Sequence, residues 1–314
     1  MAQSEQHPRI ALLGNCQKDM LWRIFQLLAP AAEVVRFSFD DLPRFATKEA
    51  LFRELAPFDF IFAQPFGTGF HPAVDGLVLK ERFRDSFHFY PAIEFNAFHP
   101  DCVYVRNLQG FARSAIGDYH SAITLLGYSL GLSVEQTLTL FRAEVFERLG
   151  YFRYWKVSED VLFKLGRAID FPIEGIYRSW VRRCPFMHSI NHPRLFVLAD
   201  VARTLLHLSG ISAVSGNVED FLPDEALYDP VWPIYPEIAE AMGFQGAYIF
   251  KVGSRSEYNP FLTLPDFVAR SWELYQKETS PLECSRIAEW TRNAPLIDAI
   301  RRFVNPVSRQ PPKP

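Results

Sequence analysis

The residues best suited to chemistry form the run Gly14-Asn15-Cys16-Gln17, between a short apolar run and a segment of helical periodicity. Ligands of open α/β sheets collect beyond the carboxyl ends of strands, so this position is typical of functional residues. A helix start favours a thiolate by about 0.3 to 2 kcal/mol, which lowers an ordinary thiol pKa of about 8.5 toward roughly 7. Cys16 is therefore a candidate nucleophile. The alternative is a small, buried apolar residue.

The second candidate is the run MHSINHP at 187–193, which separates two segments of helical periodicity. The imidazole of His188 or His192 on such a loop can act as a general base on a hydroxyl, or activate a thiol, near neutral pH. A structural interpretation is equally open, in which each His caps a helix or lies satisfied in the core. Asn191 can likewise cap the helix that follows.

The spacing of the Cys and His residues and the motifs of the sequence give little indication of a metal site or a phosphate-binding loop. Cys184, His188 and His192 are four residues apart, as zinc ligands on one helix face would be, but Pro185 and Pro193 interrupt that helix. We therefore expect no metal site. The sequence also contains no GxxxxGK[ST], GxGxxG, HExxH or GxSxG motif.

Two further predicted strand ends carry polar groups. Gln64 begins the loop QPFGTG, whose glycines and backbone amides suit either a ligand or an ordinary turn. Asn96 follows another apolar run and offers an amide that can serve an oxyanion or a structural cap.

The elements that must position these residues alternate between strand and helix in the first third of the chain. We predict strands at 9–13, 33–39, 58–63, 86–93 and 102–105, with helices at 20–28 and 48–55. This alternation predicts an α/β fold with a mostly parallel sheet that is covered on both faces.

Helical periodicity dominates the later sequence. We predict helices at 119–132, 133–149, 157–169, 176–183, 194–209, 264–277 and 285–303. Ser133 with Gln136 indicates a capping box, Gly150 a helix stop, and Pro193 the first turn of a helix. No Gly/Ser linker or charge run separates domains, so we expect one composite domain. Its parts are a sheet portion at 1–117, a helical portion at 118–220 that carries the NHP loop, an irregular then helical portion at 221–305, and a tail at 306–314.

Composition limits the class of protein. The 314 residues are 48% hydrophobic and 22% charged, which is globular rather than disordered. A net charge of −3 gives no global attraction to nucleic acid or anionic lipid. Four widely spaced cysteines are expected to be reduced, and the sequence shows neither a signal-peptide pattern nor a run of 18 apolar residues. We expect a cytoplasmic protein without a membrane span.

Three of these segments together, GNCQ after the first strand, YPAIEF…HPD at 90–101 and MHSINHP, resemble the WcbI family of bacterial polysaccharide-biosynthesis proteins over nearly the whole chain. The resemblance implies a parallel-sheet core like that of SGNH hydrolases, with a large added helical portion, adapted to bind coenzyme A. It implies an acetyltransferase that moves an acetyl group from acetyl-CoA to a sugar hydroxyl in capsule assembly. A 6-deoxy-heptose is the expected acceptor, and capsule-assembly proteins are expected partners.

Carried over by position, Gly14-Asn15-Cys16 stands where SGNH hydrolases have Gly-Asp-Ser, and His192 or His188 stands where they have a late His. Cys replaces their Ser. Ser189 replaces the acid that usually precedes the His by three residues, so no carboxylate that would orient the imidazole is evident.

Two mechanisms follow from the resemblance. Either Cys16 takes the acetyl group and passes it on, or His activates the sugar hydroxyl for direct attack. We favour direct attack, because a thioester is already activated and positioning two substrates contributes about 7 to 11 kcal/mol. The oxyanion would be held by Asn15, Asn96 and backbone N–H groups near Cys16 and Gln17.

Coenzyme A also requires cations for its phosphates. The expected CoA-binding residues are Gly14, Asn15, Gln17, Lys18, Gln64, Arg106, Asn191, Lys251 and Arg255. The rival functions are an SGNH-type esterase or deacetylase of acetylated glycans and a non-catalytic CoA- or nucleotide-binding module.

Overall fold

The computed structural model describes residues 7–253 and 261–304, which fall into two compact units. The first unit comprises Met1–Glu94, Glu159–Met187 and Asn191–Ala226; the second comprises Phe95–Ser158, His188–Ile190 and Leu227–Pro314. Each unit is therefore assembled from segments that are distant in the sequence. The single composite domain stays a prediction, and the predicted tail at 306–314 and Arg255 lie outside the described residues.

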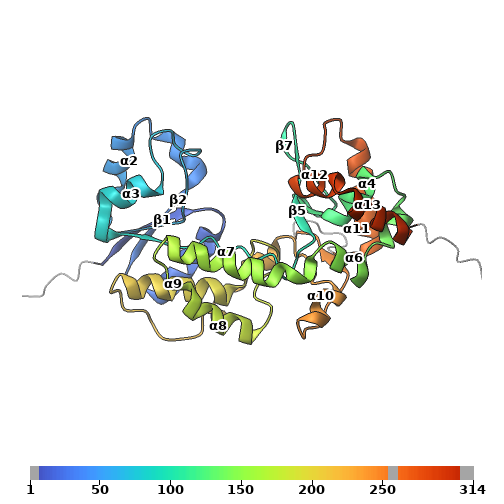
Figure 1. The fold of residues 1–314 in the computed structure, drawn as a ribbon. Coiled ribbons are helices and arrows are strands. Elements are labelled where there is room, and N and C mark those ends of the chain that lie inside the picture. The colour runs from blue at the N-terminus through green and yellow to red at the C-terminus, as the bar shows by residue number, and fades with distance from the viewer. Residues whose placement is uncertain (1–6, 254–260, 305–314) are drawn as a thin grey trace, which may run out of the picture. The chain divides into compact units, whose positions relative to one another are not determined.

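The first unit contains a four-stranded, wholly parallel sheet of order β2-β1-β3-β4 (Figure 1). Its strands are β1 (Arg9–Gly14), β2 (Glu33–Ser38), β3 (Phe60–Ala63) and β4 (Phe87–Phe89). Ile10 to Leu13 of β1 are fully buried, which explains their unbroken apolar run. The strand order reverses between β1 and β3, so the carboxyl ends of these two strands form a topological switch point.

Helices follow each of the first three strands of this unit. These are α1 (Gln17–Leu28), α2 (Lys48–Leu55) and α3 (Gly76–Phe83). Later in the chain the unit also contains α8 (Ile173–Arg183) and α9 (Leu195–Leu208), and the boundary between the units lies within α7 (Tyr154–Ala168). Thr47 and Asp75 cap α2 and α3 by accepting hydrogen bonds from backbone N–H groups of the first turn. Helix α1 packs against β1, β2 and α9. Short 3-10 turns lie at Phe39–Arg44, Arg84–Ser86, Tyr151–Arg153, Val218–Asp220 and Glu225–Tyr228.

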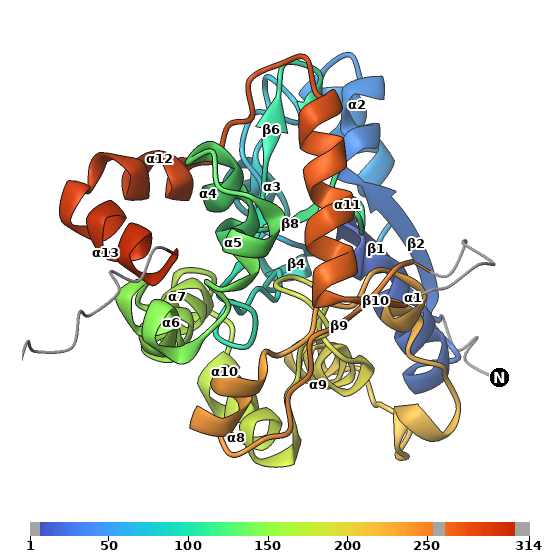
Figure 2. The same cartoon turned by 90° about the vertical axis from the view of Figure 1, so that its right-hand side faces the viewer.

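The second unit combines short antiparallel strand pairs with helices. The pairs are β5 (Cys102–Tyr104) with β8 (Tyr119–Ser121), β6 (Arg106–Asn107) with β7 (Gly110–Phe111), and β9 (Ile249–Lys251) with β10 (Phe261–Thr263). The helices are α4 (Ala122–Ser129), α5 (Val134–Leu138), α6 (Ala143–Arg148), α10 (Pro236–Ala241), α11 (Leu264–Lys277), α12 (Ser285–Arg292) and α13 (Ala294–Val304). The long helix α11 packs against α4 and α5 (Figure 2).

A buried carboxylate lies at the centre of the second unit. Asp101 is fully buried and accepts hydrogen bonds from the hydroxyls of Tyr151 (2.6 Å) and Tyr235 (2.7 Å) and from the Ile123 N–H (2.9 Å). Burial raises the pKa of Asp101 despite these donors. The carboxylate therefore joins three segments of the unit.

Most predicted elements are confirmed. Helices at 48–55 and 264–277 have the predicted bounds, and the strands at 9–13, 33–39, 58–63 and 102–105 differ by a few residues at their ends. The capping box of Ser133 and Gln136 is present, and Gly150 adopts a φ of 75° after α6. The mixed α/β class with a parallel sheet is confirmed; the SGNH-hydrolase likeness stays a prediction.

Four predictions of local structure are wrong. The helix predicted from 119 begins with β8, and the strand predicted to 93 ends at Phe89, just before Pro91 removes an N–H donor. The helix predicted at 133–149 is interrupted between α5 and α6, where the Thr139 hydroxyl donates to the Gln136 carbonyl. The helix predicted at 285–303 breaks at Asn293, whose side chain accepts the Leu296 N–H.

A fifth prediction, that of Pro193, is also wrong. Helix α9 begins at Leu195 with Arg194 as its N-cap, so Pro193 precedes the first turn instead of forming it. In the described part of the chain, no helix has both the length and the apolarity needed to cross a membrane.

Candidate functional site

The carboxyl ends of β1, β3 and β4 meet at a closely packed site in the first unit. Gly14 ends β1, Gln64 follows β3, and Tyr90 follows β4. The Tyr90 hydroxyl donates to the Leu13 carbonyl at 2.9 Å. A Cβ atom on Gly14 would overlap the Tyr90 hydroxyl oxygen and lie 2.8 Å from Gln64 Oε1, so this position requires glycine.

Gln17 holds this site together. Its side-chain amide donates to the carbonyls of Ile93 and Asn191, both at 2.9 Å. Its Oε1 accepts from the Ile93 N–H at 3.0 Å and from Gln64 Nε2 at 3.5 Å. Because both donors and the carbonyl oxygen are used by protein groups, we assign the buried Gln17 a positioning role rather than contact with CoA.

The contact between Gln17 and Asn191 joins two of the predicted segments. The two residues are 174 positions apart, and both belong to the first unit. Cys16 precedes Gln17 and His192 follows Asn191, so the contact places these two candidate residues on adjacent segments. The side chain of Asn191 is half-buried.

Cys16 and Asn15 present reactive groups at the start of α1. Cys16 is exposed, so the interpretation of this thiol as a buried apolar residue is wrong. Asn15 Oδ1 accepts from the Gln17 N–H at 2.9 Å, and the Asn15 N–H donates to Gln64 Oε1 at 2.8 Å. Within the described residues, the Asn15 side-chain NH₂ group donates to no protein acceptor. The Gln17 N–H is occupied by Asn15 and is therefore not an oxyanion donor.

Both lysines that were predicted to bind phosphate contact protein groups instead. Lys18 is nearly buried, and its ammonium pairs with Asp19 at 3.2 Å; Asp19 in turn pairs with Arg36 at 2.7 Å. The Lys251 ammonium donates to the backbone carbonyls of Leu227 and Asp229. These contacts indicate that both lysines stabilise local structure.

The MHSINHP run is divided between the two units. His188 and Ser189 belong to the second unit and are buried there. The His188 carbonyl accepts from the Trp232 N–H at 2.9 Å, and the Ser189 hydroxyl donates to the Tyr119 hydroxyl at 3.1 Å. His192, half-buried in the first unit, is therefore the candidate base that shares a unit with Cys16.

The structure brings to this segment a carboxylate that the sequence analysis missed. Asp224 Oδ2 accepts the Leu195 N–H at 3.1 Å, at the first residue of α9 and three positions after His192. Both residues belong to the first unit. The sequence near α9 held one indication of this contact. The N-cap residue Arg194 has a side chain that cannot accept hydrogen bonds from the N–H groups of the first turn, so an acceptor from elsewhere is needed.

The remaining predicted residues lie in the second unit. Asn96 is half-buried, and its carbonyl accepts from the His99 N–H at 3.0 Å. Arg106 is exposed, and its guanidinium lies 5.0 Å from the centre of the Phe111 ring. No group of three or more His, Cys, Asp or Glu side chains in residues 7–253 and 261–304 is arranged to hold a metal ion.

Comparison with known proteins identifies the family. A search of curated proteins and a search of solved structures gave no match. The model of the polysaccharide biosynthesis enzyme WcbI matches residues 9–214, about two thirds of the chain. The matched stretch begins at β1 and includes the Gly14–Gln17 run, Gln64, Tyr90 and the MHSINHP run. The chain therefore belongs to the WcbI family of polysaccharide biosynthesis enzymes.

Proposed function

We propose that the protein transfers an acetyl group from acetyl-CoA to a sugar hydroxyl, and that the strand-end site of the first unit performs the transfer. One observation carries this proposal: Gln17 fixes the exposed Cys16 segment to the segment that contains His192. This arrangement supplies a base, an amide donor and an open approach on parallel-strand ends, which suits acyl transfer.

His192 is the base in the proposed reaction. Its imidazole takes the proton from the sugar hydroxyl as the hydroxyl oxygen attacks the acetyl carbonyl carbon of the thioester. The carbonyl oxygen becomes an oxyanion, to which the Asn15 NH₂ group donates. Collapse of the intermediate breaks the carbon–sulfur bond, and the leaving CoA thiolate takes the proton back from His192.

In the proposed reaction, Asp224 is the acid that orients the imidazole of His192. SGNH hydrolases carry an acid three residues before the His, where this chain has Ser189. The Asp224 carboxylate is fixed three residues after His192 instead, at the Leu195 N–H. In the proposed reaction, this carboxylate would favour the protonated imidazole that arises during transfer.

Cys16 lines the path of the acetyl group without becoming acetylated. Moving the acetyl from one thiol to another gains little free energy, and direct attack requires only that both substrates are positioned. The acetyl-bearing end of CoA fits the exposed thiol and the Asn15 amide donor. We leave Lys18 and Lys251 out of the proposed phosphate contacts, because their ammonium groups already bond to protein groups.

The test measures release of the CoA thiol and acetylation of the methyl glycoside of 6-deoxy-heptose by mass spectrometry. Substitution His192→Gln should lower kcat by about 10² to 10⁴-fold, the usual contribution of a general base. The matched control is His207→Gln, an exposed His near the end of α9, which should leave kcat unchanged. Wild-type turnover of His192→Gln would refute the assignment of the base.

The role of Cys16 has its own test. In direct transfer Cys16→Ala keeps a measurable kcat, and protein quenched during turnover carries no acetyl group on Cys16. If acetylated Cys16 forms as fast as product, direct attack is refuted and the acetyl group passes through Cys16 as a covalent intermediate. Release of acetate from acetylated sugar, with no transfer from acetyl-CoA, would identify the protein as an esterase instead.

A further inference from the structure

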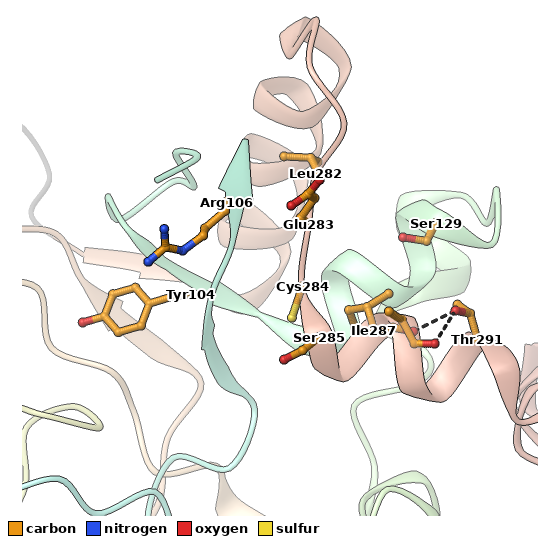
Figure 3. A pocket seen from close by; sticks show the side chains of 10 residues that line it. Tyr104, Arg106, Ser129, Leu282, Glu283, Cys284, Ser285, Ile287 and Thr291 are labelled. Carbon is orange, nitrogen blue, oxygen red and sulfur yellow. Dashed lines mark hydrogen bonds between the residues drawn. The ribbon is translucent and has the colours of Figure 1, made fainter. Parts of the chain in front are cut away.

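The second unit contains a cavity that the proposed chemistry does not use. It has a volume of about 740 Å³ and is open to solvent, with walls from β5, β6, α4 and the segment that leads into α12 (Figure 3). Ligand sites typically have volumes of about 300–1,000 Å³. The wall at 282–291 lies beyond residues 9–214, which match the WcbI family model, so this cavity includes parts outside the matched region.

Backbone pairing builds one wall of this cavity. The Arg106 N–H donates to the Glu283 carbonyl at 2.9 Å, and the Glu283 N–H donates to the Arg106 carbonyl at 2.8 Å. The next residue, Asn107, donates its side-chain amide to the Glu278 carboxylate at 2.8 Å. Two segments that are more than 170 residues apart are thus fixed together, and the wall is formed before any ligand binds.

An aromatic platform borders the cavity beside this wall. The Tyr104 side chain lines the cavity and is 37% exposed, so a ligand can reach it. Its ring lies 5.3 Å from Phe111 and 5.5 Å from Tyr119, and the Arg106 guanidinium lies 5.0 Å from the Phe111 ring. These contacts hold Tyr104 and Arg106 in place, which lowers the entropy cost of binding a ligand to them.

The charges of the lining are balanced. Arg106 contributes one cation and Glu283 one carboxylate, and neither side chain forms an ion pair with another described residue. The Ser285 hydroxyl adds a hydrogen-bonding group, while the hydroxyls of Ser129 and Thr291 donate to carbonyls of their own helices and offer a ligand only an acceptor (Figure 3). A ligand that suits this lining is uncharged, has several hydroxyls, and offers an apolar face to an aromatic ring.

We infer that this cavity binds a saccharide. The C–H groups on one face of a sugar ring pack against the negatively polarised face of an aromatic ring such as Tyr104. The Arg106 guanidinium can donate to hydroxyls of the ligand, and the Glu283 carboxylate can accept from others. CoA fits less well, because its phosphates carry several negative charges and the lining supplies a single cation balanced by Glu283. The inference rests on the proposed function for the choice of sugar.

The experiment titrates the methyl glycoside of 6-deoxy-heptose into the whole protein with saturating CoA present, and follows binding by saturation-transfer NMR. Tyr104→Ala should raise the Kd at least 10-fold by removing the aromatic platform. Ser285→Trp should do the same by filling the cavity from an exposed position. Leu108→Ala is the matched control, since Leu108 is 80% exposed and does not line the cavity.

The outcomes separate this inference from the proposed function. A Kd that is unchanged in both Tyr104→Ala and Ser285→Trp would overturn the saccharide site and leave acetyl transfer to stand on its own assay. No sugar binding by the wild-type protein would overturn the saccharide site and also count against this sugar as the acceptor. Loss of CoA binding in Ser285→Trp with unchanged sugar binding would assign the cavity to the donor and also overturn the inference. A wild-type protein that binds the sugar through Tyr104 without transferring acetyl would refute the proposed function alone.

Discussion

Substitution Gly14→Ala tests whether the strand-end site is as closely packed as its geometry indicates. Gly14 is not in the left-handed region, so its backbone accepts an L-residue and the effect of the substitution is steric. The added methyl group meets Gln64 Oε1 at 2.8 Å and overlaps the Tyr90 hydroxyl oxygen. Both partners must move, and each currently makes a hydrogen bond at this site.

The magnitude follows from two costs. Forcing one extra carbon into a filled site costs about 1–3 kcal/mol. Loss of the Asn15–Gln64 and Tyr90–Leu13 hydrogen bonds adds about 0.5–1.5 kcal/mol each. The free energy of unfolding of Gly14→Ala should therefore fall by about 2–6 kcal/mol. Displacement of Asn15 and Cys16 should also lower kcat, since a shift of about 1 Å can cost 10²-fold.

Tyr90→Phe offers a direct check of the cause. It removes the hydroxyl that overlaps the new methyl group, while the Leu13 carbonyl keeps the bond from the Gln64 N–H at 3.0 Å. Tyr90→Phe alone should cost about 1 kcal/mol. The double variant should be more stable than the sum of the two single effects predicts, by about 1–3 kcal/mol.

Urea unfolding followed by circular dichroism gives the four free energies of this cycle. Gly67→Ala is the control, because a Cβ atom there meets nothing within 4 Å, and its free energy of unfolding should change by less than about 1 kcal/mol. Equal effects at Gly14 and Gly67, or strict additivity of Gly14→Ala with Tyr90→Phe, would refute the packing argument.

Three further predictions address charges. Burial lowers the pKa of His120 to about 4, so the unfolded chain gains a proton first and stability falls by about 3 kcal/mol between pH 6.5 and 4; His120→Gln should remove this loss, which urea unfolding at both pH values measures. Asp101→Asn should lower the free energy of unfolding by about 1–3 kcal/mol, because the NH₂ group of Asn cannot accept the hydrogen bond that a buried tyrosine hydroxyl now donates to a carboxylate oxygen. An unchanged urea midpoint would contradict this prediction. Asp224→Asn keeps an acceptor for the start of α9 but loses its charge, so the acidic limb of kcat/KM should move to lower pH; an unmoved limb would leave Asp224 as a helix cap only.

Local sequence signals predicted the elements whose causes are local. The apolar run before Gly14 and the periodicity after it placed the junction of β1 and α1 correctly. Thr263 with Asp266 forms a capping box at the predicted start of α11. The break between α12 and α13 also has a local signal, since Pro295 lacks the N–H that a continuous helix needs, but the apolar periodicity of 285–303 continues across it.

The residues around the contacts that build the site and the cavity wall did not identify their distant partners. Gln17 contacts Asn191, Asp224 contacts Leu195, and Arg106 pairs with Glu283, each across at least 29 residues. The residue types alone made Cys16 and His192 candidate functional residues, because thiols and imidazoles have distinctive chemistry. A glutamine amide has many structural uses, so its pattern alone could not separate a positioning role from ligand binding.

The choice of an amide to join the two segments has a chemical consequence. Gln17 has no proton to gain or lose near neutral pH, so the bonds to Ile93 and Asn191 keep the same strength when the imidazole of His192 changes charge. A carboxylate in the place of Gln17 would repel the two backbone carbonyls that its amide now bonds, and it would favour a charged imidazole nearby. In the proposed reaction, the neutral amide therefore holds the backbone beside His192 without altering the charge of the imidazole, and stabilisation of the imidazolium is left to Asp224.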